Sequence, residues 1–505
     1  MTTWTVSTIE VESKAAAKPQ AAVVLFVVAC VLTGLMGRFA YLVRPFDHDA
    51  AMFVYLGKSV CDGDRFCHDV IDNKFPSVGL MTSIFWRMFG TNWAAYVVAQ
   101  TVMAFGGVLL LARCAARHFG QPARLPTALA GMIYLNFTVA VFGGFQLETL
   151  QVSFTIVSAC SAIEAMRGRS WKDALVVGLG AGCAAMLKPT GLAPLGAFWC
   201  ILMLGGSGRV RMLLASLAGL CIPVAVTVVY MVAFDILRDV PTLVRQISEY
   251  ASSTPMAWED VFKPLTVLVL AGFGIVVRGW VFRRDRVTRE IAADGQIVRF
   301  AVIWFVLEMI GAVMQRRMYG YHFLPVGAPA ALLFGMIPRR DRAISLAAAL
   351  GPIMIISVLG AREVLNYPDP RGSITPASAY LLEHTSPGDA IWQDSMPRVL
   401  LETGLRPGAR FPIMFIFGNT DTSALEYTPI ILSDFEQRRP KYIILPTDMD
   451  EKLEGETTYC AHLTRSPVRA ENFKRAWREI EKYVKANYVA EIRLRGDTIY
   501  RRRAS

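Results

Sequence analysis

Apolar segments long enough to cross a bilayer recur along residues 21–361, separated by short polar loops. A membrane-spanning helix needs about 20 apolar residues in a row, and the segments at 21–43 and 92–114 both reach this length. Since cytoplasmic loops carry an excess of Lys and Arg, basic residues in every second loop predict about eleven spans with the N-terminus inside. These basic loops lie at 113–124, 167–172, 209–211, 283–286 and 339–342.

The two ends of the chain differ from this membrane domain. No small-residue cleavage site follows the segment at 21–43, so we expect an uncleaved signal anchor behind a cytoplasmic tail at 1–20. The spans end near Leu359, and an odd number of spans places the rest of the chain outside the cytoplasm. From 362 to 505 the apolar runs shorten to strand length, as in YIILP and YVAEIRL, and alternate with helix-like stretches. The pattern therefore predicts a polytopic α-helical membrane domain followed by a small extracytoplasmic α/β domain.

The first outer loop, 44–90, carries an unusual number of acids for a membrane protein. Within it, AAMFVYLGKSV is long enough for about three helical turns but too short to cross a bilayer. We expect this run and a second one at 79–89 to form juxtamembrane helices that lie along the membrane surface. Such a helix would hold carboxylates at the water boundary, where an enzyme acting on a lipid-linked substrate needs its general base. The acids of the loop are Asp47, Asp49, Asp62, Asp64, Asp69 and Asp72.

Composition agrees with a membrane protein and limits its partners. Of the 505 residues, 54% are hydrophobic and only 18% are charged, so most of the length must be embedded in lipid. The net charge of +11 reflects the basic loops that set topology. We therefore predict contact with membrane lipid and no nucleic-acid partner.

Cysteine and histidine residues indicate no required metal or other cofactor. The nine cysteines form no metal-binding pattern. In an oxidising compartment Cys61 and Cys67, six positions apart, are expected to form a disulfide, and two unpaired thiols are the alternative. Asp47, His48 and Asp49 are ligand types for a divalent cation, but neighbouring side chains in a helix or strand do not face one ion. We expect no essential metal, with a divalent cation as the open alternative.

Several basic residues lie in segments that the topology places outside, against the usual bias. Lys74 ends the acidic loop, Lys188 lies at an outer turn, and Arg317 and His322 follow the ninth span. Cations that converge on one outer rim favour binding of a phosphate by charge-assisted hydrogen bonds. Each residue alone is equally typical of a side chain that extends to the lipid head groups.

Other polar residues are candidates for the same pocket. Glu148 begins a span from the outer side, where an ionisable group is a functional candidate, although an acid at a helix N-terminus also has a structural explanation. Asp69 and Asp72 lie in the acidic loop. Tyr319 and Tyr321 flank the ninth span and are also typical of interfacial aromatic residues.

Two groups of residues resemble a known family when they are read in order. The first has an acid opening a helix, a glycine, a His-Asp pair and a Lys-Phe-Pro run: Asp49, Gly63, His68, Asp69, Lys74, Phe75 and Pro76. The second has a KPTG turn, an R-x-Y run, a Tyr-His pair and a proline: Lys188, Arg317, Tyr319, Tyr321, His322 and Pro325. This order resembles the GT-C glycosyltransferases that use polyprenyl-phosphate sugars, especially the branch with protein O-mannosyltransferases and the lipid A aminoarabinose transferase.

The chain departs from the family pattern at three places. Phe75 replaces the first proline of a Lys-Pro-Pro run, His68 takes the place of a tyrosine, and the Tyr321-His322 pair stands in reversed order. The resemblance covers most of the chain and implies a GT-C fold with a C-terminal extracytoplasmic domain. Because of the departures, the sugar and its acceptor stay unidentified.

The resemblance implies a hexosyl- or pentosyltransferase in the bacterial inner (plasma) membrane, with its active site outside the cytoplasm. Asp49 would act as general base on an acceptor hydroxyl, which displaces the lipid phosphate from the sugar with inversion. A positioned carboxylate contributes roughly two to four orders of magnitude to such a step. Asp47 is the alternative base and is otherwise a helix cap. Lys74, Lys188 and Arg317 are expected to line the cavity that Asp49 faces, where they would stabilise the leaving phosphate.

Two other functions fit parts of the pattern. A transporter or flippase of lipid-linked sugars would use the acids as substrate or proton sites, but transporters favour internal repeats and ionisable residues at mid-membrane. The chain shows no clear repeat, and its charges lie at the ends of spans. A non-catalytic binder of lipid-linked glycans is the second alternative, and it would tolerate loss of Asp49.

Overall fold

The structure is a computed structural model of the chain, in which helices dominate the membrane part. It describes the isolated positions 28, 32 and 38 and the ranges 41–42, 48–136, 145–204, 208–252, 295–316, 319–336, 374–394, 397–412, 417–418, 420–447, 466–494 and 496–504. Most of the predicted span at 21–43, and the segments 253–294 and 337–359, therefore lie outside the described residues.

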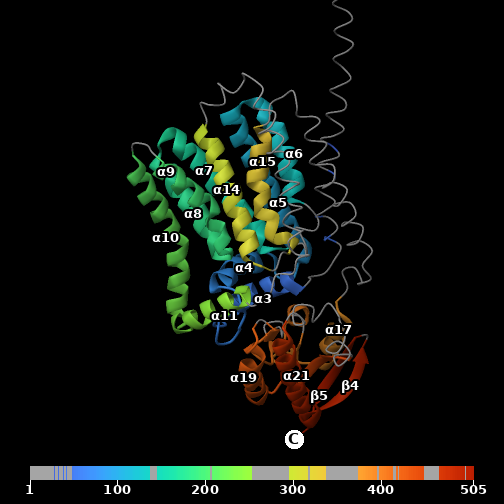
Figure 1. Cartoon of the computed structure of the whole chain (residues 1–505). Helices are drawn as coiled ribbons and strands as arrows, with labels where there is room; N and C mark the ends of the chain where they lie inside the picture. Colours follow the sequence, from blue (N-terminus) through green and yellow to red (C-terminus); the bar gives the residue numbers. More distant parts are fainter. Residues whose placement is uncertain are drawn as a thin grey trace, which may run out of the picture.

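A bundle of roughly parallel helices forms the larger part of the molecule (Figure 1). Within the described residues, four helices are long and apolar enough to cross a membrane: α5 (Trp93–Phe119), α7 (Leu147–Gly168), α10 (Arg209–Ala233) and α14 (Gly295–Met314). The shorter helices α6 (Arg124–Leu135), α8 (Trp171–Leu187), α9 (Ala193–Met203) and α15 (Gly327–Gly335) pack among them. On α10, Val226 and Val229 are exposed, as expected of side chains that face lipid.

Glycines allow two of these helices to pack at backbone distance. A Cβ atom on Gly178 of α8 would lie 1.8 Å from the Ser216 carbonyl oxygen of α10. A Cβ atom on Gly219 of α10 would lie 2.0 Å from the Leu175 carbonyl oxygen of α8. Small residues commonly make such close approaches in membranes, because van der Waals packing drives helix association there.

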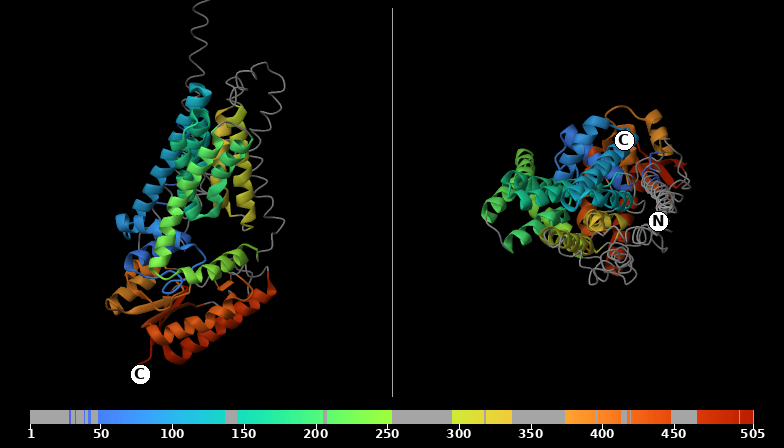
Figure 2. Two further views of the ribbon diagram at one scale, coloured as in Figure 1. Left: turned by 90° about the vertical axis from the view of Figure 1, so that its left-hand side faces the viewer. Right: turned by 90° about the horizontal axis from the view of Figure 1, so that it is seen from above.

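A layer of short helices lies at one end of the bundle, between it and the C-terminal domain (Figure 2). It contains α3 (His48–Asp62), α4 (Pro76–Phe89) and α11 (Val240–Ser252). The helices α3 and α4 pack closely, since a Cβ atom on Gly57 would lie 2.6 Å from the Thr82 backbone. Helix α4 begins at Pro76, three residues before the start at 79 that the sequence predicted. Proline is favoured at the first position of a helix, which explains the earlier start.

The C-terminal part contains a five-stranded mixed sheet with the order β2-β1-β3-β5-β4. The strands are β1 (Ala390–Gln393), β2 (Arg406–Pro407), β3 (Tyr442–Pro446), β4 (Tyr488–Leu494) and β5 (Asp497–Arg502). Strand β1 pairs in parallel with β2 and β3, and β5 pairs antiparallel with β3 and β4. The helices of this part are α17 (Pro376–His384), α18 (Arg398–Thr403), α19 (Ser423–Arg438) and α21 (Pro467–Asn487).

Aromatic residues form the core between this sheet and its helices. Trp392 of β1 meets Phe435 of α19 edge to face at 5.1 Å, and Trp477 of α21 is buried in the same cluster. Such aromatic pairs contribute about 0.5–1.5 kcal/mol beyond the burial of their area. The alternation of strands and helices predicted from 362 onward is thus present in the described residues.

Candidate active site

Asp49 lies in the first turn of α3, at the layer between the bundle and the C-terminal domain. The next two residues, Ala50 and Ala51, are fully buried, whereas Asp49 is partly exposed. The hydroxyl of Tyr321 donates a hydrogen bond to Asp49 Oδ2 at 3.3 Å. The carboxylate is therefore oriented by a side chain from the 3-10 helix η5 (Gly320–Val326), more than 270 positions away, and remains open to solvent.

Lys188 is held at the turn where α8 ends. Its backbone is extended, and the following Pro189 cannot continue the helix. The turn returns tightly against α8, because a Cβ atom on Gly191 would lie 2.5 Å from the Ala184 carbonyl carbon. Glycine at this position therefore fixes the place from which the lysine side chain extends.

Glu148, at the start of α7, is the main partner of this lysine. The Lys188 ammonium forms an ion pair with Glu148 Oε1 and donates a second hydrogen bond to Gln315 Oε1 at 3.2 Å. Glu148 is 1% exposed, so its charge is compensated inside the protein. His322 is also close, with Nε2 4.0 Å from Glu148 Oε1.

Tyr321 joins the acid and the lysine into one group. The Lys188 ammonium lies 5.6 Å from the centre of the Tyr321 ring, within the range of a cation–π contact. Tyr319 stacks on Tyr321 at 5.3 Å, and His322 packs edge-on against it at 4.7 Å. We call this group the Asp49–Lys188 cluster, and its members are Asp49, Glu148, Lys188, Gln315, Tyr319, Tyr321 and His322.

Lys74 lies in a segment that adjoins the cluster. Its ammonium donates a hydrogen bond to Asn73 Oδ1. Three residues later, Ser77 Oγ donates to the Met186 carbonyl at 2.6 Å, which places the start of α4 beside the end of α8. Lys74 and Lys188 thus each lie within three positions of the same contact, although no contact among the described residues joins them directly.

Asp69 and Asp72 do not join the cluster, so their assignment to the pocket around Asp49 is corrected here. Asp69 accepts hydrogen bonds from the Arg65 backbone at 3.0 Å and from Arg65 Nε at 3.2 Å. Partial burial raises the pKa of Asp69, but these bonds outweigh it and lower the pKa overall. Asp72 is 3% exposed and lies against the C-terminal domain and α11. Both acids follow the end of α3, where the chain turns away from the bundle.

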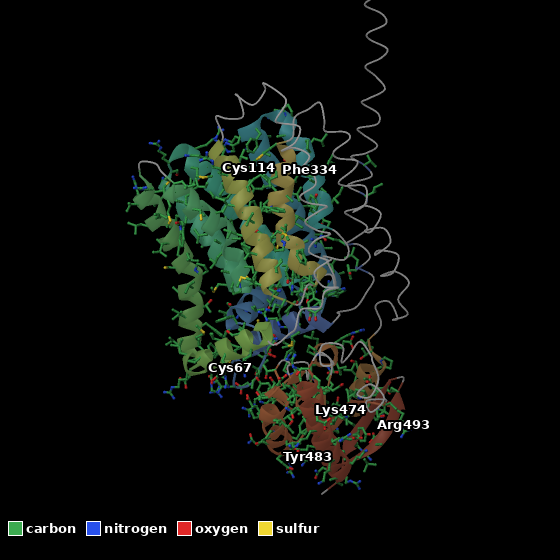
Figure 3. All side chains as sticks on the ribbon, viewed as in Figure 1. Cys67, Cys114, Phe334, Lys474, Tyr483 and Arg493 are labelled. Atoms are coloured by element: carbon green, nitrogen blue, oxygen red, sulfur yellow. The ribbon has the colours of Figure 1, made fainter. Side chains whose placement is uncertain are left out.

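The predicted disulfide is wrong, because Cys61 and Cys67 are both free thiols. Cys61 lies in the last turn of α3, and its Sγ donates to the Ser83 carbonyl of α4 at 3.6 Å. Cys67 lies in the turn beyond the helix with a φ of 70°, close to Asp239 (Figure 3). Burial raises the pKa of the Cys67 thiol to about 12, so it stays protonated at neutral pH. The end of the helix and the turn direct the two side chains to different neighbours.

Two predicted site residues, Asp47 and Arg317, lie outside the described residues.

Arg38 is a buried charge that the sequence did not lead us to predict. Its guanidinium donates to the Leu135 carbonyl at 2.9 Å and to Asn136 Oδ1, at the end of α6. A basic residue inside the apolar segment 21–43 was the available signal, since ionisable groups within spans are functional candidates by default.

Comparison with known proteins agrees with this fold. Residues 73–234 match the sequence profile of the family described as dolichyl-phosphate-mannose-protein mannosyltransferase. Among solved structures, the chain is similar to ArnT from Cupriavidus metallidurans bound to undecaprenyl phosphate, with a TM-score of 0.57 and 13% sequence identity. That match covers 95% of this chain and 98% of ArnT. The apo state of the same ArnT gives the same TM-score and identity over 96% of this chain and 98% of ArnT.

No curated protein sequence matches the chain significantly. The profile match over residues 73–234 and the ArnT-like fold support a relationship to the GT-C glycosyltransferase superfamily. At 13% identity, the similarity to the ArnT structures concerns the fold alone. The roles of individual residues must be argued from the geometry of this chain.

Proposed function

We propose that the chain transfers a sugar from a polyprenyl-phosphate donor to an acceptor hydroxyl on the extracytoplasmic face of the membrane, with Asp49 as general base. The observation that carries this proposal is the Asp49–Lys188 cluster, in which a solvent-accessible carboxylate and a lysine flank one tyrosine. An acceptor hydroxyl is a weak nucleophile at neutral pH, and a base within hydrogen-bond reach removes its proton as it attacks.

Asp49 suits the role of base better than Glu148, the other acid of the cluster. Glu148 is 1% exposed and already pairs with Lys188. A proton acceptor must reach the incoming hydroxyl, and Asp49 is the partly exposed acid of the two. Tyr321 occupies one oxygen of Asp49 and leaves the other for the acceptor. Asp47 remains the alternative base in this proposal.

The phosphate of the donor would meet the cationic side of the cluster. As the sugar–phosphate bond breaks, negative charge grows on the leaving phosphate, and preorganised cations stabilise that charge. Glu148 and Gln315 hold Lys188 in one position before the donor arrives. Lys74, Arg317 and His322 complete the proposed phosphate site. The similarity to an ArnT structure bound to undecaprenyl phosphate supports a lipid phosphate as ligand.

The proposal is tested by comparing Asp49→Asn with Asp62→Asn in the purified protein. The first change keeps the shape of the base and removes its function, whereas Asp62 is an exposed acid at the far end of the same helix. With a panel of polyprenyl-phosphate sugars, we expect Asp49→Asn to slow donor consumption about a hundredfold or more with little change in donor binding. Asp62→Asn should stay near the wild-type rate. Normal transfer by Asp49→Asn with a dead Asp47→Asn would identify the other carboxylate as base, and activity in both would refute the mechanism.

A further inference from the structure

The turn that carries Lys188 is held at a second point, which the proposed reaction does not use. This turn, the 3-10 helix η2 (Pro189–Leu192), follows Lys188 directly. The side-chain amide of Gln151 donates a hydrogen bond from Nε2 to the Thr190 hydroxyl at 2.8 Å. Gln151 is fully buried in α7, three residues after Glu148. Residues three apart lie on the same face of a helix, so one face of α7 holds both Lys188 and Thr190.

The segment of α14 and Gln315 contacts the same two residues. A Cβ atom on Gly311 of α14 would lie 2.9 Å from Thr190 Cγ2, so the helix backbone packs directly on the threonine. Four residues later, Gln315 accepts the hydrogen bond from Lys188 and donates to the Gly311 carbonyl at 3.3 Å. The amide of Gln315 is therefore bonded at both ends. Two segments of the bundle thus each hold the turn at both Lys188 and Thr190.

A second anchor matters because one contact does not fix where the lysine ammonium lies. The side chain of lysine is a flexible four-carbon stem, so the place of its charge depends on the backbone from which it extends. If only Glu148 held Lys188, the turn could rotate about that ion pair. The bond between Gln151 and Thr190 is buried and two residues along the turn, so it opposes such a rotation. A cation that stabilises a leaving phosphate has to be in place before the charge develops.

We propose that Gln151 is a positioning residue for the donor phosphate, because it holds the turn at Thr190 and thereby fixes the Lys188 ammonium beside Tyr321. The alternative is a structural role alone, since a buried amide requires a hydrogen-bond partner wherever it lies. A structural role predicts lower stability with no specific effect through Lys188. The inference rests on the proposed function in one respect, namely that Lys188 contacts a lipid phosphate.

A double-mutant cycle separates the two roles. The full chain in detergent is titrated with undecaprenyl phosphate, and the Kd is measured by calorimetry. Gln151→Leu should raise this Kd about tenfold, since a displaced ammonium loses much of its charge-assisted hydrogen bond to the phosphate. In the Lys188→Met/Glu148→Gln background no ammonium remains to be displaced, and the same change should alter the Kd less than about twofold.

Thr190→Val gives an independent route to the same result. It removes the hydroxyl and keeps a methyl group to pack on Gly311, so it should reproduce the effect of Gln151→Leu. The double variant Gln151→Leu/Thr190→Val should bind no more weakly than either single variant, because both changes break one bond.

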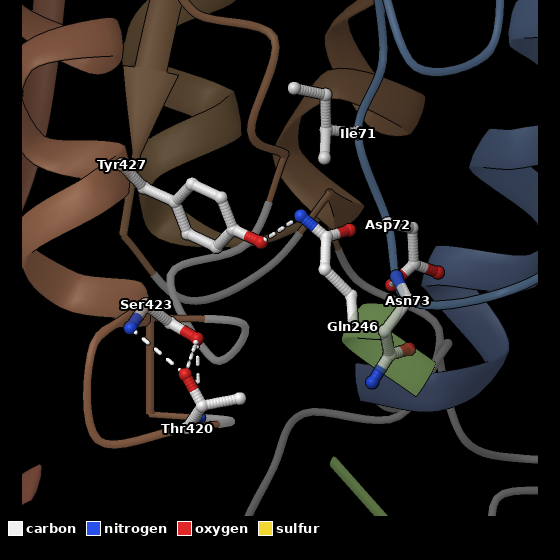
Figure 4. A pocket seen from close by; sticks show the side chains of 7 residues that line it. All are labelled: Ile71, Asp72, Asn73, Gln246, Thr420, Ser423 and Tyr427. Atoms are coloured by element: carbon white, nitrogen blue, oxygen red, sulfur yellow. Dashed lines mark hydrogen bonds between the residues drawn. The ribbon is translucent and has the colours of Figure 1, made fainter. Parts of the chain in front are cut away.

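Gln246→Leu is the matched control. Gln246 of α11 also donates from its amide to a hydroxyl, that of Tyr427 on α19, and this bond joins the membrane part to the C-terminal domain (Figure 4). The same substitution there breaks a bond of the same kind that does not involve the Lys188 turn. We expect the Kd for undecaprenyl phosphate to stay within about twofold of the wild-type value.

The outcomes distinguish this inference from the proposed function. Binding of undecaprenyl phosphate that depends on both Lys188 and Gln151, in a protein that consumes no polyprenyl-phosphate sugar, would keep the positioning role and refute the transfer reaction. Donor consumption that depends on Asp49, together with an unchanged Kd in Gln151→Leu, would overturn the positioning role alone. An equal rise in Kd with and without the Lys188 ammonium would overturn it as well.

Discussion

Helix α3 and the turn that follows it, 63–72, carry similar acids but form hydrogen bonds to different parts of the molecule. Helix α3 presents Asp49 to Tyr321 of the bundle. In the turn, the Ile71 amide donates to the Arg410 carbonyl of the C-terminal domain at 2.7 Å, and Arg438 reaches the Asp69 carbonyl at 3.5 Å. Asp49 thus hydrogen-bonds to the bundle through its side chain, whereas the segment 69–71 hydrogen-bonds to the C-terminal domain through its backbone.

The difference follows from local structure. In the middle of α3 the backbone groups are paired within the helix, so mainly side chains are available for other partners. In the turn after it, the Arg65 carbonyl accepts from the amides of His68, Asp69 and Val70, whereas the Ile71 amide donates outside the turn, to the Arg410 carbonyl. Because buried backbone groups must be paired, such a segment requires a neighbour with a free carbonyl. The C-terminal domain supplies that neighbour, and the loop becomes the joint between the two parts.

The largest expected effect comes from breaking the buried ion pair in the first contact. Lys188→Met leaves Glu148, 1% exposed, without its countercharge. Removal of one partner from a buried pair typically costs about 3–5 kcal/mol. Thermal unfolding in detergent should show a loss of this order. The double variant Lys188→Met/Glu148→Gln should recover much of it, because no unpaired charge remains.

Lys58→Met is the matched control for this change. Lys58 pairs with Asp62 on the same layer of the protein, but Asp62 is 46% exposed. Surface pairs of this kind contribute about 0.2–1 kcal/mol. Equal destabilisation by Lys58→Met and Lys188→Met would mean that the Lys188–Glu148 pair contributes no more to the free energy of unfolding than an exposed pair does.

The second prediction concerns the joint to the C-terminal domain. Asp434, 1% exposed, accepts hydrogen bonds from the backbone of Arg410 at 2.8 Å and from its guanidinium at 2.6 Å. Asp434→Asn removes the charge that orients Arg410. The backbone carbonyl of Arg410 accepts the hydrogen bond from the Ile71 amide. We expect a loss of about 1.5–3 kcal/mol, as for hydrogen bonds to charged groups. Hydrogen exchange at the Ile71 amide should accelerate, whereas exchange at the amides within α3 should not.

Glu479→Gln provides the comparison for this prediction. Glu479 lies on α21 in the same domain and forms an exposed pair with Arg475. Its removal should change stability by less than about 1 kcal/mol and leave the Ile71 amide protected. If Asp434→Asn leaves exchange at Ile71 unchanged, the Arg410–Asp434 pair does not support the joint.

The sequence predicts those parts of the site that depend on local periodicity. The apolar run after Asp49 predicts α3, and the proline and glycine after Lys188 predict a turn there. Strands at YIILP and YVAEIRL also form as predicted, as β3 and β4. Each of these features is decided by neighbours within a few positions, which the sequence displays directly.

Partner choice over long distances was not predictable in the same way. Asp69 and Asp72 stand near Lys74 in the sequence, yet the Asp69 carbonyl and the Asp72 side chain lie against residues more than 300 positions away. The non-helical turn has no periodicity, so spacing gives no direction for its side chains. The spacing of Cys61 and Cys67 allowed a disulfide, but the last turn of a helix and a residue with positive φ orient their side chains apart.

The smallest expected effect distinguishes the Asp69 side chain from its backbone. Asp69→Asn removes the contact with Arg65 and keeps the carbonyl that Arg438 reaches, so we expect the joint to persist. The pKa of Asp69 is lowered in the folded state, so its stabilising contribution is present above the unfolded pKa of about 3.9 and is lost as pH falls through the folded value. Because Asp69 is more than one-third exposed, the loss at neutral pH should be only about 0.2–1 kcal/mol. Unfolding midpoints of wild type and Asp69→Asn should therefore converge at acid pH, and a difference that grows on acidification would contradict the assigned role of Arg65.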